Sequence, residues 1–164
     1  MAHNIELIQD KELHRITSTA IIYKKEDGVF KYLITKRSPT KKVHPNKWTV
    51  PGGGLSTDDY VHGEPQHGSA WYNSLVVSLK REIQEEVNVE VGKLDFLLDL
   101  TFIRPDGIPV ITFSYYAPFV SGDVKLDGDS VEYAWVTEPE AKGYDLIEGI
   151  YEEIEMVENI LKGK

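Results

Sequence analysis

The sequence predicts an α+β fold in which helices pack on a mixed β-sheet. Strand-like stretches precede and follow a central stretch of helical periodicity, and a second helical stretch ends the chain. The length of 164 residues suits one compact unit, and a composition of 41% hydrophobic and 27% charged residues excludes a disordered or collagen-like chain. We therefore expect a single domain over residues 1–164.

Apolar runs bounded by turn residues predict the strands. They are expected at 16–25, 30–36, 48–50, 89–100, 101–104, 109–120 and 130–136. The turn Glu26-Asp27-Gly28 makes the first two a hairpin, and Pro105-Asp106-Gly107 separates two later strands. The third strand stops at Pro51-Gly52-Gly53-Gly54, where we expect a special backbone turn.

Apolar residues at steps of three and four predict two amphipathic helices. The central helix is expected from an N-cap at Ser69 to about Val87, and the second, which is acidic, from about Asp145 to Leu161. Residues 55–68 are polar and have neither period, so we expect them to form a loop.

Composition also excludes several kinds of protein. The absence of cysteine rules out disulfides, thiolate metal sites and cysteine nucleophiles. A net charge of −9 disfavours a long nucleic acid as partner. No run of 18 apolar residues occurs and residues 1–6 do not resemble a secretion signal, so we expect no membrane partner and a cytoplasmic location.

Three glutamates at the end of the central helix are the strongest chemical signal. Glu82, Glu85 and Glu86 stand at positions i, i+3 and i+4, which places them on one helix face. Clustered negative charge is costly unless a cation neutralises it, and Mg²⁺ prefers oxygen ligands. A solvated acidic helix face is the alternative interpretation.

The residues around these glutamates resemble a known signature. Arg81-Glu82-Ile83-x-Glu85-Glu86-x-Asn88-Val89 follows Trp-x-x-Pro-Gly-Gly and is similar to the Nudix hydrolase box, Gly-x5-Glu-x7-Arg-Glu-U-x-Glu-Glu-x-Gly-U, where U is aliphatic. With the flanking strands and Glu132-Tyr-Ala-Trp135-Val, the resemblance covers most of residues 15–160. It implies a Nudix-type α/β/α sandwich with a mixed sheet, in which the central amphipathic helix carries the box.

The chain departs from the signature in two places. Gly53 precedes Arg81 by 28 positions rather than 14, so the chain has 14 extra residues, expected within 55–68. Counted back from Arg81, Asn73 stands where the box has its first glutamate, and that carboxylate is missing unless Asp59 or Glu64 replaces it. Asn88 replaces the closing glycine and is expected to adopt the left-handed conformation that ends the helix.

The resemblance implies a metal-dependent enzyme of the pyrophosphatase type. Its reaction would be hydrolysis of a phosphoanhydride bond in a nucleoside diphosphate linked to another moiety, with Mg²⁺ or Mn²⁺ as cofactor. By motif position, the metal ligands would be Glu82, Glu85, Glu86 and the carbonyl of Gly52. The catalytic groups would be Glu85, Arg81 and a late carboxylate, for which Glu132 is the first candidate and Asp106 the second. Substrate phosphates would lie against Arg37, Gly53 and Gly54.

Other interpretations stay open. A catalytically silent Nudix-fold module that binds a nucleotide or regulates a partner is the main alternative, because of Asn73 and the extra residues. A prenyl diphosphate isomerase of the same fold is disfavoured by the lack of cysteine. The expected partner is a small nucleotide, and the chain is expected to be a monomer or a homodimer. The nucleobase and the leaving group have no motif that predicts them.

Overall fold

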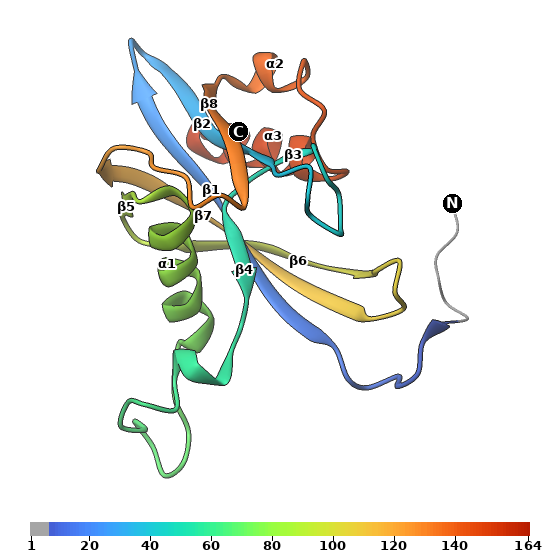
Figure 1. Ribbon diagram of the computed structural model, residues 1–164. Helices are drawn as coiled ribbons and strands as arrows, with labels where there is room; N and C mark the ends of the chain where they lie inside the picture. The colour runs from blue at the N-terminus through green and yellow to red at the C-terminus, as the bar shows by residue number, and fades with distance from the viewer. Residues whose placement is uncertain (1–6) are drawn as a thin grey trace.

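A computed structural model describes residues 7–164 as a mixed sheet with helices on both faces (Figure 1). The strands are β1 (Arg15–Glu26), β2 (Val29–Arg37), β3 (Trp48–Thr49), β4 (Gly52–Gly54), β5 (Glu90–Val91), β6 (Asp95–Ile103), β7 (Pro109–Ser121) and β8 (Ser130–Val136). The helices are the short 3₁₀ helix η2 (Thr57–Asp59), α1 (Ser74–Val87), α2 (Glu138–Ala141) and α3 (Ile150–Leu161). Residues 1–6, from which the absence of a secretion signal is predicted, lie outside the described residues.

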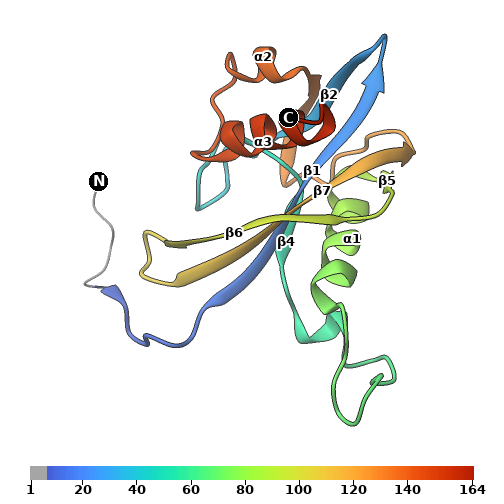
Figure 2. The same cartoon turned by 180° about the vertical axis from the view of Figure 1, so that it is seen from behind.

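Strand β1 is the centre of the sheet. It pairs in parallel with β7 on one edge. On its other edge the carboxyl-terminal part pairs with β2 and the part at Thr17–Thr19 pairs with β4, both antiparallel. Strands β5 and β6 extend the sheet from β7, while β3 and β8 extend it from β2. One edge of β1 is thus shared by two different strands, and β4 lies there beside α1 in both views (Figure 2).

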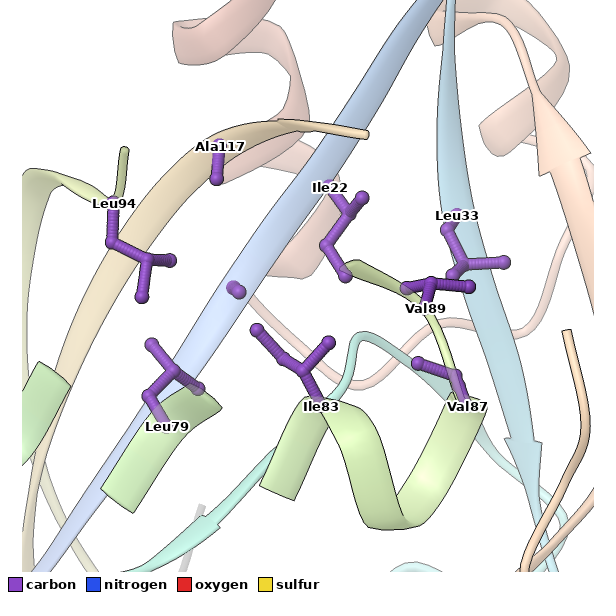
Figure 3. Close-up of a cluster of buried hydrophobic side chains, with 9 residues drawn as sticks. Ile22, Leu33, Leu79, Ile83, Val87, Val89, Leu94 and Ala117 are labelled. Atoms are coloured by element: carbon purple, nitrogen blue, oxygen red, sulfur yellow. The ribbon is translucent and has the colours of Figure 1, made fainter. Parts of the chain in front are cut away.

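Two apolar clusters hold the helices on opposite faces of the sheet. On one face Ala20 and Ile22 pack with Leu79, Ile83 and Val87 of α1 (Figure 3). On the other face, Ile21 packs in the cluster that contains the buried side chains of α3. Neighbouring residues of a strand point to opposite faces, so the buried middle of β1 contributes to both clusters. The predicted α/β/α sandwich with a mixed sheet is confirmed.

The central helix begins later than its apolar spacing predicts. The expected N-cap at Ser69 is wrong, because α1 starts at Ser74 after Asn73, which has a left-handed backbone (φ 60°). Trp71 fits the helical spacing of the apolar residues, but it lies before the helix, where its indole N–H donates to the carbonyl of Gly63, 2.7 Å away. Residues 60–73 instead form a loop that projects from the amino-terminal end of α1 (Figure 1), which we call the excursion.

Other boundaries are also corrected. The glycines are not a turn but strand β4. The strand expected at 89–100 is interrupted between β5 and β6, and its second part continues through the separate strand expected at 101–104. The last helix starts at Ile150 rather than near Asp145, because residues 145–147 bond to β3: Trp48 N–H donates to Asp145, and Ile147 N–H to Trp48.

None of the helices formed by residues 7–164 is both long and apolar enough to span a membrane.

Candidate active site

The three glutamates of α1 lie on its last two turns, beside the glycine strand β4. Glu82 is 16% exposed at its side chain and packs on Gly53. Glu86 accepts a hydrogen bond from the backbone N–H of Gly52 at 3.0 Å, and Glu85 is more than half exposed. Asn88 ends the helix with the expected left-handed backbone (φ 57°, ψ 37°). The helix therefore presents its carboxylates directly to the strand.

The glycines of β4 are required for different reasons. A Cβ at Gly52 would meet the backbone of Ser18 and Thr19 on β1, and a Cβ at Gly53 would overlap the carboxylate of Glu82. At Gly54 the space is filled by the guanidinium of Arg15. The backbone of Gly53 is therefore the surface on which Glu82 rests, and Arg15 brings a positive charge to the same strand.

The backbone of Gly52 faces away from β1. The carbonyl of Pro51 accepts from Ala20 of β1 at 2.9 Å, so the N–H and carbonyl of the next residue point to the opposite edge of the strand. The Gly52 N–H does so, since it reaches Glu86. The Gly52 carbonyl therefore lies on the same edge as its N–H, on the Glu86 side, as the predicted role of accessory metal ligand requires.

Arg81 connects the glutamates to η2. Its guanidinium is 2.5 Å from Asp59, 3.0 Å from Glu82 and 3.0 Å from Glu85. Asp59 has only 2% of its side chain exposed and also accepts from the backbone N–H of Ser56 at 2.8 Å in a capping box. Bonding to Arg81 lowers the pKa of Asp59 to about 2. Of the two replacements considered for the missing box carboxylate, the structure brings Asp59 to Arg81.

The cluster is short of positive charge. Burial raises the pKa of Glu86 to about 7, the charges of Glu82, Asp127 and Asp129 act in the same direction, and the Gly52 N–H opposes them. Burial also raises the pKa of Glu82, against the effect of Arg81. A divalent cation bound beside these carboxylates would offset the cost of their ionisation, which agrees with a metal site.

Arg37, at the end of β2, lies on the Glu86 side of the site. Burial lowers its pKa, while the charges of Glu86 and Asp129 oppose that shift. Its Nε donates to the carbonyl of Val43 at 3.0 Å. Asp127 and Asp129 belong to the loop between β7 and β8, and their charges reach Glu86. Sequence reasoning missed these two; the available signal was Asp-Gly-Asp just before a strand.

The structure does not bring the two proposed late carboxylates to the glutamates. Glu132 of β8 forms an ion pair with Lys36 at 2.7 Å, on the face where its neighbour Ala134 packs in the α3 cluster. Asp106 pairs with Arg104 at 2.6 Å in the β6–β7 turn, far from the carboxyl end of α1 in both views (Figures 1 and 2). The sheet lies between Glu132 and α1, because successive residues of a strand face opposite sides.

The donor set fits a hard divalent cation. Three carboxylates and one backbone carbonyl offer only oxygen, which Mg²⁺ and Mn²⁺ prefer. Within residues 7–164, no three side chains of Asp, Glu or His yet converge as a metal would require. Glu82 and Glu85 both contact Arg81, so they would have to turn from it toward a bound ion.

Comparisons with known proteins agree with this geometry. Residues 13–155 match the model of the NUDIX domain. The nucleoside triphosphatase NudI of Klebsiella pneumoniae is 26% identical over 126 residues, which are 70% of this chain and 79% of that protein.

Two solved structures share the fold. The Ap4A hydrolase of C. elegans superposes with a TM-score of 0.68 at 19% identity, over 92% of this chain and 99% of that one. The NUDIX domain of Shewanella oneidensis NrtR, in complex with ADP ribose, superposes with a TM-score of 0.71 at 16% identity, over 92% and 90%. The match to the family model covers most of this chain, and the glutamates of the box lie beside a glycine strand. The chain therefore belongs to the Nudix hydrolase family.

Proposed function

We propose that this protein hydrolyses a phosphoanhydride bond of a nucleoside triphosphate or of a nucleotide-linked metabolite, with Mg²⁺ or Mn²⁺. The observation that carries the proposal is the cluster of Glu82, Glu85 and Glu86 on one helix face beside Gly52, whose backbone N–H donates to Glu86. The similarity to a nucleoside triphosphatase and to an Ap4A hydrolase fold supports a nucleotide as substrate.

Glu82, Glu86 and the carbonyl of Gly52 would hold the ion. When bound, a divalent cation neutralises phosphate oxygens and acidifies a coordinated water. Glu85 is the most exposed of the three glutamates, and it would orient the attacking water and accept its proton. Arg81 is a positioning residue, because it touches Glu82 and Glu85 rather than the open side of the site.

Groups outside α1 would complete the site. Asp127 would supply the late carboxylate in place of Glu132, since its charge reaches Glu86, whereas Asp129 is paired with Lys41. Arg37, beside Glu86, would hold a substrate phosphate. The side chains of Glu82 and Arg15 fill the space beside Gly53 and Gly54, where the sequence predicts substrate phosphates. We therefore propose Arg15, rather than the two glycines, as the phosphate contact at this strand.

The extra residues are best placed in the excursion. Asp59 follows Gly53 with five residues between them, as the glutamate follows the glycine in the uninterrupted box. On this alignment the 14 extra residues lie between Asp59 and Arg81 rather than within 55–68, and Asn73 is not a lost catalytic position. The box would then be complete but divided, which favours the enzyme over the silent module.

The test is phosphate or pyrophosphate release from nucleoside triphosphates, dinucleoside polyphosphates, ADP-ribose and nucleotide sugars, with Mg²⁺, Mn²⁺ or EDTA. Turnover that EDTA abolishes is expected for at least one class. No turnover with any of them, while calorimetry shows metal binding, would support the silent nucleotide-binding module. A cytoplasmic location, a single domain over 1–164 and a monomer or homodimer remain predictions.

A further inference from the structure

The excursion has a defined conformation held by its own contacts. The Trp71 indole N–H donates to Gly63, and the Tyr72 N–H donates to the side chain of Gln66 at 2.8 Å. His67 and Ala70 close a small antiparallel bridge with each other. The excursion can therefore shape a binding surface.

A shallow pocket of about 200 Å³ lies between the excursion, η2 and the start of α1. Three aromatic side chains line it: Tyr60, Trp71 and Tyr72. Tyr60 and Trp71 are in contact, with ring centroids 5.4 Å apart, and Tyr72 is 55% exposed and stacks on His67. The pocket thus offers aromatic surface to a ligand rather than to the protein core.

The charge of the pocket selects among ligands. Asp58 and Glu64 line it, and among the described residues of its wall there is neither lysine nor arginine. His62 also lines it, with its Nε2 3.4 Å from Asp58, and offsets that carboxylate only when the imidazole is protonated. Asp59 also lines it, but its charge is paired with Arg81. A phosphate would be repelled here, whereas a cation is attracted both by carboxylates and by the negative faces of aromatic rings.

We propose that this pocket binds a compact organic cation, such as a quaternary or primary ammonium group. The site is separate from the glutamates that would bind metal, and binding there does not require hydrolysis. The cation can be a free amine or the cationic end of a larger ligand, since the same aromatic and carboxylate groups would recognise either source.

The first experiment compares choline with 3,3-dimethylbutanol, which has the same shape without the charge. Each is titrated into the metal-free, full-length protein and followed by the NMR signal of the Trp71 indole N–H. We expect choline to shift this signal saturably and to bind at least tenfold more tightly than the neutral isostere. Equal binding of the two, or no shift with choline, would overturn the proposal.

Matched variants locate the site. Asp58→Asn with Glu64→Gln should weaken choline binding at least tenfold, because both carboxylates are lost while the aromatic rings stay. Glu155→Gln, which removes an exposed charge on α3, should leave it unchanged. The thermal midpoint of each variant shows whether the fold is kept. Unchanged choline binding by the double variant, or tighter binding of a neutral nucleobase than of choline, contradicts the proposal.

Hydrolysis kinetics distinguish a free amine from a cationic group of the substrate. If free amine is the ligand, choline added to the wild-type enzyme changes its KM for a nucleoside triphosphate, and the double variant loses that response. If the cation is part of the substrate, the double variant loses kcat/KM only for a nucleoside diphosphate linked to an amino alcohol. Because choline binding is measured without turnover, failure of the cation site and failure of the hydrolase proposal are separate results.

Discussion

Helices α1 and α3 pack on opposite faces of the sheet, and both are rich in glutamate. They differ in the hydrogen-bond donors that surround their buried carboxylates. In α3, Glu153 accepts from the hydroxyl of Ser114 at 2.5 Å, and Glu158 accepts from the hydroxyl of Tyr32. Each buried glutamate of α3 therefore has a hydroxyl donor of its own. In α1, Glu86 accepts from the backbone N–H of Gly52 and lies among three acidic neighbours, with the charge of Arg37 nearby.

The difference separates a structural carboxylate from a functional one. Buried polar groups are normally paired, and a buried carboxylate surrounded by more negative than positive charge would gain stability from a bound cation. Acidic helical spacing is common to both helices, so the spacing alone does not identify the site. The supply of donors around each carboxylate does.

The largest expected effect is on catalysis. Glu85→Gln and Glu86→Gln should each lower kcat/KM a hundredfold or more, about 3 kcal/mol of transition-state stabilisation, because each removes a charge that metal or water needs. Glu153→Gln keeps a hydrogen-bonding group against Ser114 and should stay within a few-fold of wild type. Steady-state assays with Mg²⁺ check both. Wild-type rates in the two α1 variants would refute the site assignment.

Gly53→Ala tests how closely Glu82 approaches the strand. The added methyl group would displace the Glu82 carboxylate, which is the end of a flexible side chain, so activity should fall at least tenfold while the fold is retained. Gly143→Ala, where a Cβ has room, is the matched control. Metal titration by calorimetry should show weaker binding for Gly53→Ala; unaltered affinity and rate would contradict the contact.

Asp59→Asn tests the divided box. Without its charged partner, Arg81 would hold Glu82 and Glu85 less firmly, and we expect kcat to fall about tenfold with little change in KM. Asp59→Glu should restore most of the activity, which a loss of fold would not allow. Asp99→Asn on the exposed side of β6 is the control. Full activity of Asp59→Asn would show that Arg81 does not need this partner.

The smallest effect is on the stability of the metal-free protein. The pKa of Glu86 is raised from 4.5 to about 7, so the folded state binds more protons than the unfolded state between these values. The contribution of Glu86 to stability should therefore be largest below pH 4.5 and fall as the pH rises toward 7.

Glu86→Gln should remove that loss and raise the thermal midpoint at pH 8, by roughly 2–4 °C for each kcal/mol recovered. Tyr32→Phe in the α3 pair should instead lower the midpoint, because Glu158 loses its hydroxyl donor. Calorimetry in EDTA measures both. A lower midpoint for Glu86→Gln would mean that this glutamate is structural.

Local patterns were sufficient for the long strands β1, β2, β7 and β8 and for the face of α1, but not for the glycine strand β4 or the break between β5 and β6. Alternation along Ala20, Ile21 and Ile22 predicts a strand, and the spacing of Glu82, Glu85 and Glu86 predicts that they share a face, since both follow from the chain's own repeat. The start of α1 was not predictable in this way. Trp71 and Leu75 have helical spacing, but the indole of Trp71 bonds to Gly63 and Asn73 adopts a left-handed backbone.

The contacts that complete the site join residues far apart in the chain. Asp59 reaches Arg81 across 22 positions, and the charges of Asp127 and Asp129 reach Glu86 from the loop before β8. Glu132 lies on the other face of the sheet for the same kind of reason, because the pleat of β8 turns it to the α3 side. Residue type and spacing specify which side chains share a helix face, whereas only the packed sheet decides which distant carboxylates meet there, since that depends on strand order and on the face of each strand.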